Sequence, residues 1–207
     1  MDLGVFYNIA EVSIKSIVAS VFCLVCVIIE PSYLKEEVSM AYTLEQLSND
    51  CHDAMAEDPG KSGREKVRDF IAKACADAEF VDEHFENPGQ EERQVLYEDP
   101  DFKFCILAHS YNGPKGSNPH DHGPSWAIYG QAVGETIMTD WECIEKPSES
   151  KPGKVKKVCE YSLKPGDAHV YHEGYLHSPR READTRLIRV EGQNLMGVKR
   201  DKYEVAA

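Results

Sequence analysis

The sequence predicts a mainly β fold, a barrel or sandwich of short strands that follows a group of N-terminal helices. Two observations lead to this prediction. After residue 89, short runs rich in β-branched and aromatic residues follow at close intervals, separated by Gly, Pro, Asn and Asp. Before residue 87, apolar residues recur instead at helical spacing. A length of 207 residues is enough for one domain with a sizeable core and an appendage.

The bulk composition narrows the classes of partner. The chain is 42% hydrophobic and 29% charged, as soluble globular proteins are. Its formal net charge of −13 argues against nucleic acid and anionic membrane surfaces as general partners, because both bind through basic patches. We therefore expect a small-molecule partner, no nucleic acid and no membrane. The composition does not indicate an oligomeric state.

Residues 1–39 are interpreted as an N-terminal extension without a part in the chemistry. Their run 17–29 is almost wholly apolar, but it is shorter than the about 20 residues of a membrane-spanning helix. A signal peptide is the second interpretation, although Asp2 and Glu11 weaken its positive end and no small-residue cleavage site follows. We favour a domain that begins near Met40, and keep an anchor or targeting segment as the alternative.

The cysteines indicate a reducing compartment. The seven Cys are scattered along the chain, and their number is odd. Cys23 and Cys26 form a CxxC, but it lies inside the apolar run and no second pair accompanies it, so we interpret it as chance. Scattered, unpaired cysteines are typical of reducing conditions. The expected location is therefore the cytoplasm.

The elements follow in order from the local pattern. A first helix is predicted over 43–58, where apolar residues at helical spacing stop at a Pro-Gly pair. One or two more helices are predicted over 63–86, and we expect the whole segment 40–88 to pack on a β-barrel formed by 89–207. The predicted strands are RQVLYE, FKFCILAHSY, SWAIYGQAVGETIMTDWE, KVCEYSL, AHVYHEG and TRLIRVEG. The polar stretch 146–157 is predicted as an exposed hairpin loop.

Two histidines one residue apart are the first candidate site. Positions i and i+2 of a strand share a face, so His120 and His122 can point together into a barrel and bind one metal ion. The ordinary interpretation is that both are surface or hydrogen-bonded core residues. A second segment, PGDAHVYHEGYLHSP, changes this balance. There, Gly166 is followed after five residues by His172, then by Gly174 and by His177.

The two spacings resemble the two sequence motifs of the cupin superfamily. The first motif is His-x-His, four residues, an acidic ligand, six residues and Gly, which corresponds to His120, His122, position 127 and Gly134. The second is Gly, five residues, Pro-x-Gly, two residues and His, which ends at His177. The resemblance covers about residues 90–195. It implies a double-stranded β-helix barrel in which these three histidines converge on a metal.

Two departures from the motifs point to one branch of the superfamily. Ala127 stands at the acidic position and His172 at the motif proline, so the ligand set has three histidines and no carboxylate. Such a set resembles the thiol dioxygenases, cysteine dioxygenase and mercaptopropionate dioxygenase, as do the KF pair at 103–104 and the run around Gly116 and Ser117. The resemblance implies an iron(II) enzyme that oxidises a small thiol or a related carboxylate with O₂. Ala127 excludes the Cys–Tyr thioether that mammalian members form there.

The substrate-binding and catalytic residues follow less directly from the resemblance. The family's Arg or Gln for the substrate carboxylate falls near Gln94, with Arg93 beside it. The family's Ser-x-His-x-Tyr is absent, and on the corresponding strand Arg189 and Glu191 share a face and are candidates to replace it. The remaining candidates are His172 and Tyr171 for catalysis and Tyr129 for the substrate pocket. A solvated strand face or aromatic core packing is the ordinary interpretation of these residues.

The metal and the reaction type stay open at the level of sequence. Imidazole suits Fe, Zn, Ni and Mn, so iron is preferred only because of the resemblance. The alternative function is a non-oxidative cupin, a lyase, isomerase or hydrolase. It would use a metal-bound water, whose pKa on zinc is about 7. A non-catalytic binding cupin is the third class, and the intact set of three histidines argues against it.

Overall fold

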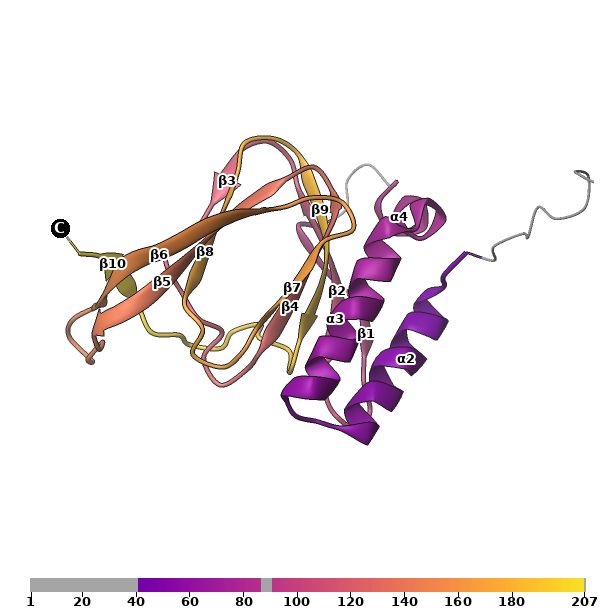
Figure 1. The fold of residues 1–207 in the computed structure, drawn as a ribbon, viewed down its shortest axis with the longest axis horizontal. Helices are drawn as coiled ribbons and strands as arrows, with labels where there is room; N and C mark the ends of the chain where they lie inside the picture. The colour runs from indigo at the N-terminus through magenta and orange to yellow at the C-terminus, as the bar shows by residue number, and fades with distance from the viewer. Residues whose placement is uncertain (1–40, 87–90, 207) are drawn as a thin grey trace, which may run out of the picture. The chain divides into compact units, whose positions relative to one another are not determined.

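The computed structural model describes residues 41–86 and 91–206, so the interpretations of residues 1–39 lie outside the described residues. Within these described residues, three helices come first and ten strands follow (Figure 1). The helices are α2 (Leu44–Glu57), α3 (Lys61–Ala76) and α4 (Ala78–Phe85). The strands are β1 (Arg93–Glu98), β2 (Cys105–Tyr111), β3 (Lys115–Gly116), β4 (Ala127–Val133), β5 (Thr136–Glu145), β6 (Gly153–Leu163), β7 (Ala168–Tyr171), β8 (His177–Arg181), β9 (Thr185–Glu191) and β10 (Tyr203–Val205).

The strands form two five-stranded sheets. The first has the order β1-β2-β9-β4-β7 and the second the order β10-β6-β5-β8-β3. Neighbours are antiparallel except β10 and β6, which run parallel. Strands that are far apart in sequence, such as β2 and β9, lie side by side, and the sheets curl toward each other (Figure 1). This arrangement is a two-sheet β-sandwich, and it confirms the predicted mainly β fold with helices before it.

The helices cover the outer face of the first sheet. A capping box starts α2, since the Thr43 hydroxyl accepts from Gln46 N and the Gln46 side chain accepts from Thr43 N. Helix α3 lies against β4, β7 and β9 (Figure 1). It approaches β4 so closely at Gly130 that a Cβ there would lie 2.4 Å from the Cγ2 atom of Ile71. The proposed division of the chain at residues 40 and 89 stays a prediction.

A buried carboxylate joins α2 to the turn between β1 and β2. Asp99 is fully buried and accepts hydrogen bonds from the backbone N–H groups of Asp101 and Phe102, from the Tyr97 hydroxyl and from His52 Nδ1. Every lone pair of this carboxylate therefore has a partner. The possible ligand atoms of His52, Asp99 and Asp101 also lie within 4.8 Å of one another. The hydrogen bonds to Asp99 explain this cluster as a structural contact between α2 and the turn.

Strand alternation divides the first sheet into two faces. Ile106, Ile128 and Ile188 face the helices and belong to their common core. The alternate residues point to the opposite face, toward the interior of the sandwich. Because Leu107 and Tyr129 both pair with Arg189, side chains of β2, β4 and β9 meet there in one row. None of the helices in the described part of the chain has the length and apolar character that a membrane crossing requires.

Candidate metal centre and cavity

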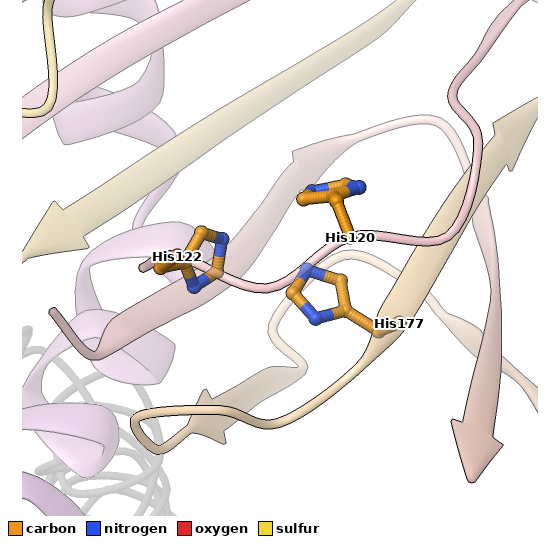
Figure 2. Close-up of side chains that lie close together, drawn as sticks. All are labelled: His120, His122 and His177. Atoms are coloured by element: carbon orange, nitrogen blue, oxygen red, sulfur yellow. The ribbon is translucent and has the colours of Figure 1, made fainter. Parts of the chain in front are cut away.

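Three histidines from two segments come together at one end of the interior. His120 forms an isolated antiparallel bridge with His177, the first residue of β8, and the two exchange backbone hydrogen bonds of 3.0 Å. His122 follows two residues later. One ring nitrogen from each residue lies within 4.8 Å of the others (Figure 2). The predicted candidate ligands are therefore neighbours in space, although their binding of a metal stays a proposal.

The local backbone differs from the predicted strand. His120 belongs only to a single bridge, and a turn at Gly123 and Pro124 follows His122. The prolines beside this segment, Pro119 and Pro124, lack the N–H that a continuous ladder requires. The histidines are thus brought together by pairing with β8 rather than by strand alternation alone.

Backbone carbonyls orient two of the rings. His120 Nδ1 lies 2.9 Å from the Asn118 carbonyl oxygen, and His177 Nδ1 lies 3.2 Å from that of Tyr175. When Nδ1 donates to a carbonyl, Nε2 keeps the lone pair that a metal ligand requires. His177 Nε2 and His122 Nδ1 are both buried and have no hydrogen-bond partner among the described residues. Unpartnered buried nitrogens are what a metal ion would satisfy, so the donor set fits one.

Burial also keeps the three imidazoles neutral. It lowers the pKa of His120 to about 4, and nearby Arg200 and Arg189 lower it too. Burial and neighbouring positive groups hold the pKa values of His122 and His177 well below the ordinary range. Metal binding requires the neutral form of histidine, so no proton has to leave at neutral pH. Three neutral ligands would leave a divalent ion its full charge.

Two tyrosines contact this histidine group in different ways. The Tyr129 hydroxyl lies 3.1 Å from His122 Nε2, so the polar atom itself reaches the group. Tyr171 instead stacks its ring on His177, with centroids 4.0 Å apart and planes at 25°. Its hydroxyl lies 2.9 Å from that of Tyr161. Tyr129 can therefore exchange hydrogen bonds at the site, whereas Tyr171 can only hold a ring in place.

A cavity of about 720 Å³ opens beside the histidines. Of the three histidines, His120 lines it, and Tyr129, whose hydroxyl lies beside His122, lines it too. Residues 200–204 form another part of its wall. Its lining is unusually basic for a protein of this net charge. Its charged lining residues are five cations, Lys115, Arg181, Arg189, Arg200 and Lys202, and two carboxylates, Asp201 and Glu204. The arrangement is able to hold a small anionic molecule beside a metal ion.

Arg189 lies at the cavity beside the histidines, whereas Arg93 reaches it only through their shared partner Glu191. The guanidinium carbon of Arg189 lies 4.5 Å from the centroid of the Tyr129 ring, and Arg189 lines the cavity. Its Nη2 lies 3.1 Å from one oxygen of buried Glu191. Arg93 Nη2 reaches the other oxygen at 3.0 Å but is not part of the lining. One carboxylate is thus shared by two guanidinium groups.

The structure does not bring Gln94 or His172 to the histidine group. Gln94 is exposed and pairs with Ala108, so it lies on the sheet face opposite to that of Arg93 and His109. His172 follows inward-facing Tyr171 and consequently points the other way. Burial lowers the pKa of His172, and the nearby charges of Lys61 and Arg64 on α3 lower it too. His172 therefore lies on the helix side of the sheet. A position in a sequence motif does not fix the direction of either side chain, because a shift of one residue along a strand moves a side chain to the other face.

Two cavity residues were not predicted as site residues. His109 and Arg181 hold no position in either sequence motif. Both are buried and line the cavity. The signal that could have found Arg181 is its place four residues after His177, since positions 177, 179 and 181 share one face of a strand. His109 shares a face with its sheet partner Arg93 in the same way.

Comparisons with known proteins find distant likenesses to solved structures. No family model matches this sequence, and no curated protein matches it. Among solved structures, a cupin superfamily protein from Desulfitobacterium hafniense is 12% identical, with a TM-score of 0.35 over 50% of this chain and 78% of that one. A cupin-2 domain protein from Shewanella frigidimarina is 13% identical, with a TM-score of 0.38 over 54% and 89%. KdgF from a Halomonas species is 18% identical, with a TM-score of 0.37 over 51% and 86%.

These neighbours carry no argument about activity at such identities and TM-scores, and the fold assignment rests on the strand order given above. None of the three is described as a thiol dioxygenase. The narrower resemblance to that branch therefore rests on the sequence motifs alone.

Proposed function

We propose that this protein is a metal-dependent enzyme that oxidises the sulfur of a small thiol carboxylate with O₂. His120, His122 and His177 would hold the metal, with iron(II) as the first choice. The observation that carries the proposal is the group of three neutral imidazoles beside a basic cavity. In the reaction, both atoms of O₂ are added to the thiol sulfur to give a sulfinic acid, so no further oxidant or reductant is needed.

The metal and the chain have separate tasks in this proposal. When bound, iron(II) would supply adjacent open positions for a thiolate and for dioxygen. The chain supplies the rest. Arg189 offers positive charge in the cavity, and the Tyr129 hydroxyl stands beside His122, where it can donate to a bound group. Tyr171 holds the His177 ring through stacking, so we propose that it positions the ring and does not react.

Residues from other positions can replace part of the missing Ser-x-His-x-Tyr motif. At the corresponding strand, β9, the polar residues that follow inward-facing Leu187 on the same face are Arg189 and Glu191. Glu191 is buried and both of its oxygens are engaged by arginines, so it is not free to contact a substrate. Tyr129 on β4 is consequently the hydroxyl that we propose for the role of the absent residues.

Oxygen uptake tests the proposal directly. The purified full-length protein is analysed for metal, then loaded with iron(II) without oxygen, and offered cysteine, mercaptopropionate and cysteamine. We expect O₂ consumption with a thiol carboxylate, sulfinate as the product, and one O₂ consumed for each thiol. Full iron occupancy without uptake on any thiol would overturn the dioxygenase and favour a non-oxidative lyase, isomerase or hydrolase. The same histidines would then serve another divalent metal.

A further inference from the structure

Arg181 is a buried cation that has no ion-pair partner among the described residues. Its side chain is 5% exposed, and no carboxylate within residues 41–86 and 91–206 lies within ion-pair distance of it. Its Nε has no hydrogen-bond partner in the same residues. The contact that holds the guanidinium is the ring of Tyr111, 4.4 Å from the guanidinium carbon. Burying a charge is costly unless it is paired, so a residue in this state indicates an absent partner.

The surroundings of Arg181 increase the excess of positive charge. Arg93 and Arg189 already share the carboxylate of Glu191. Three guanidinium groups and one carboxylate leave two positive charges in this part of the interior. His109 lies among them, and burial together with Arg189, Arg93 and Arg181 holds its pKa well below the ordinary range. The histidine is therefore neutral and adds no positive charge to that of the arginines.

His109 offers a second polar group to the same space. Its Nδ1 lies 2.9 Å from the Tyr111 hydroxyl, and its buried Nε2 has no partner among the described residues. If Tyr111 donates to Nδ1, Nε2 carries the hydrogen and becomes a donor. A donor and an unpaired guanidinium that line one cavity are the groups that recognise an anion.

The position of Arg181 separates this anion site from the histidine group. His177 begins β8 and Arg181 ends it, and both point to the interior. Their Cα atoms are about 13 Å apart, since a strand rises about 3.3 Å per residue. His120 and Arg181 nevertheless line the same cavity. One molecule can therefore have its reacting group near the histidines and an anionic group nearer to Arg181.

We propose that Arg181, assisted by Arg189 and His109, binds a carboxylate group of the substrate. The carboxylate matches the planar fork of an arginine, which can donate two parallel hydrogen bonds to it. Only the statement that the bound molecule is the substrate rests on the proposed function. The anion site itself is independent of the reaction and of the metal. It also replaces Gln94 as the residue expected to hold the carboxylate.

The neighbouring arginine provides a matched control. Arg180 precedes Arg181 on β8, but it points outward, is exposed and pairs with Glu182. Arg181→Met and Arg180→Met thus remove the same charge from opposite faces of one strand. A merely structural role of Arg181, through its contact with Tyr111, predicts a lower melting temperature for Arg181→Met. An unpaired buried cation predicts instead a melting temperature equal to or above that of the wild type.

The experiment measures binding of succinate to the full-length protein in chloride-free buffer, by calorimetry and by the shift in melting temperature. Succinamide is the neutral probe of similar shape, and inorganic phosphate is the other anion. We expect wild type and Arg180→Met to bind succinate alike and to ignore succinamide. Arg181→Met should bind succinate at least about tenfold more weakly, which is the effect of losing one charge-assisted hydrogen bond.

Three results would overturn the proposal. Unchanged succinate affinity in Arg181→Met would mean that the anion binds elsewhere, for example directly to a metal. Equal loss in Arg180→Met would mean a non-specific charge effect. Binding of phosphate without binding of succinate would exclude a carboxylate ligand. The dioxygenase function fails separately, because inactive iron-loaded protein that still binds succinate through Arg181 would keep the anion site and lose only the reaction.

Discussion

Contacts with neighbouring residues orient the rings of the candidate metal ligands. The Asn118 and Tyr175 carbonyls fix the rings of His120 and His177, and the ring of Tyr171 supports His177 from one side. Partners of this kind usually tune affinity as well as orientation. Single residues around the histidines are therefore expected to have distinguishable effects on metal content and on rate.

The first prediction concerns the ligands themselves. Loss of an outer contact of a metal ligand typically lowers metal affinity by about 10–100-fold. We expect at least this loss when a ligand itself is removed, in His120→Ala, His122→Ala or His177→Ala. His172→Ala is the matched control, since this histidine faces α3. Metal content after dialysis, measured by elemental analysis, checks the expectation. Wild-type metal content in all three ligand variants would refute the proposed metal centre.

The second prediction concerns the Tyr129 hydroxyl. Tyr129→Phe keeps the ring under Arg189 but removes the oxygen 3.1 Å from His122 Nε2. We expect kcat for O₂ uptake to fall about tenfold, the effect of one hydrogen bond of about 1.4 kcal/mol, with metal content unchanged. Tyr161→Phe removes a hydroxyl one residue further out, next to Tyr171, and should leave kcat near wild type. Equal effects of the two substitutions would contradict a role for Tyr129 at the substrate.

At the scale of elements, the seam between α3 and β4 holds the helices on the first sheet. Gly130 lets the two backbones approach, since a Cβ would lie 2.4 Å from Ile71 Cγ2 and 2.8 Å from Cys75 Sγ. The same strand carries Tyr129 on its other face. Packing on the helix side is therefore connected through one strand to the position of a cavity residue.

Gly130→Ala is predicted to destabilise the protein by overpacking, by about 1–3 kcal/mol. Ile71→Ala creates a cavity and should cost about 2–5 kcal/mol. The double variant should cost less than the two single variants together, because the new methyl group occupies space vacated by Ile71. Urea unfolding of the four proteins measures this coupling. Strict additivity would show that Gly130 and Ile71 are not in contact.

The tie between α2 and the β1–β2 turn supports a second prediction at this scale. Asp99→Asn should lower the free energy of unfolding by about 2 kcal/mol or more, because an amide NH₂ would face the donors that now point at a carboxylate. Asp101→Asn is the control, since the Asp101 side chain is 71% exposed and makes only a weak contact with His52 Nε2, at 4.0 Å. Chemical unfolding at neutral pH compares the two. A similar small loss in both variants would contradict the tie.

The same carboxylate gives a pH dependence with a definite sign. Burial alone would raise the pKa of Asp99, but hydrogen bonds from Phe102 and His52 outweigh it, and the pKa is lowered. Its contribution to stability is therefore present above the ordinary pKa of about 3.9 and is lost as the pH falls through the lowered value. The hydrogen bond to Asp99 raises the pKa of His52. That contribution is complete below about pH 6.5 and is lost as the pH rises through the raised value.

Acid unfolding provides the measurement. The wild type should lose stability between about pH 4 and pH 2 more steeply than Asp99→Asn does, because the variant has no carboxyl to protonate there. His52→Ala should flatten the dependence on the neutral side instead. Parallel curves for wild type and Asp99→Asn below pH 4 would show that the Asp99 pKa is not lowered in the folded protein.

At the scale of the whole molecule, residues Ala41–Ala207 form one compact unit that contains the helices, both sheets and the cavity. A chain that begins at Met40 is therefore predicted to fold and to bind as much metal as the full chain. Circular dichroism, melting temperature and elemental analysis compare the two forms. Loss of folding or of metal in the shorter chain would show that residues 1–39 take part in the barrel or the site.

The sequence by itself determined the fold class and the identity of the central histidines. Turn residues between short β-rich runs identified most of the strands, although β3, β8 and β10 were not predicted and β4 and β5 were predicted as one run. Two spacings singled out His120, His122 and His177. Such features are readable because turn chemistry and motif spacing are local properties of the chain. The helix at α2 could be predicted for the same reason, since its capping residues and its Pro-Gly stop lie within the segment.

Only the tertiary structure decided which other side chains share the site with these histidines. Gln94 and His172 point away from the interior, whereas His109 and Arg181, which had no motif position, line the cavity. The physical reason is that strand register has a period of two, so a shift of one residue reverses a side chain. The register of β8 and β9 is fixed by partners far away in sequence, and β1 pairs with the adjacent β2 through a register shift between Val95 and Tyr97. An unpaired charge such as that of Arg181 likewise becomes visible only when every neighbour is in place.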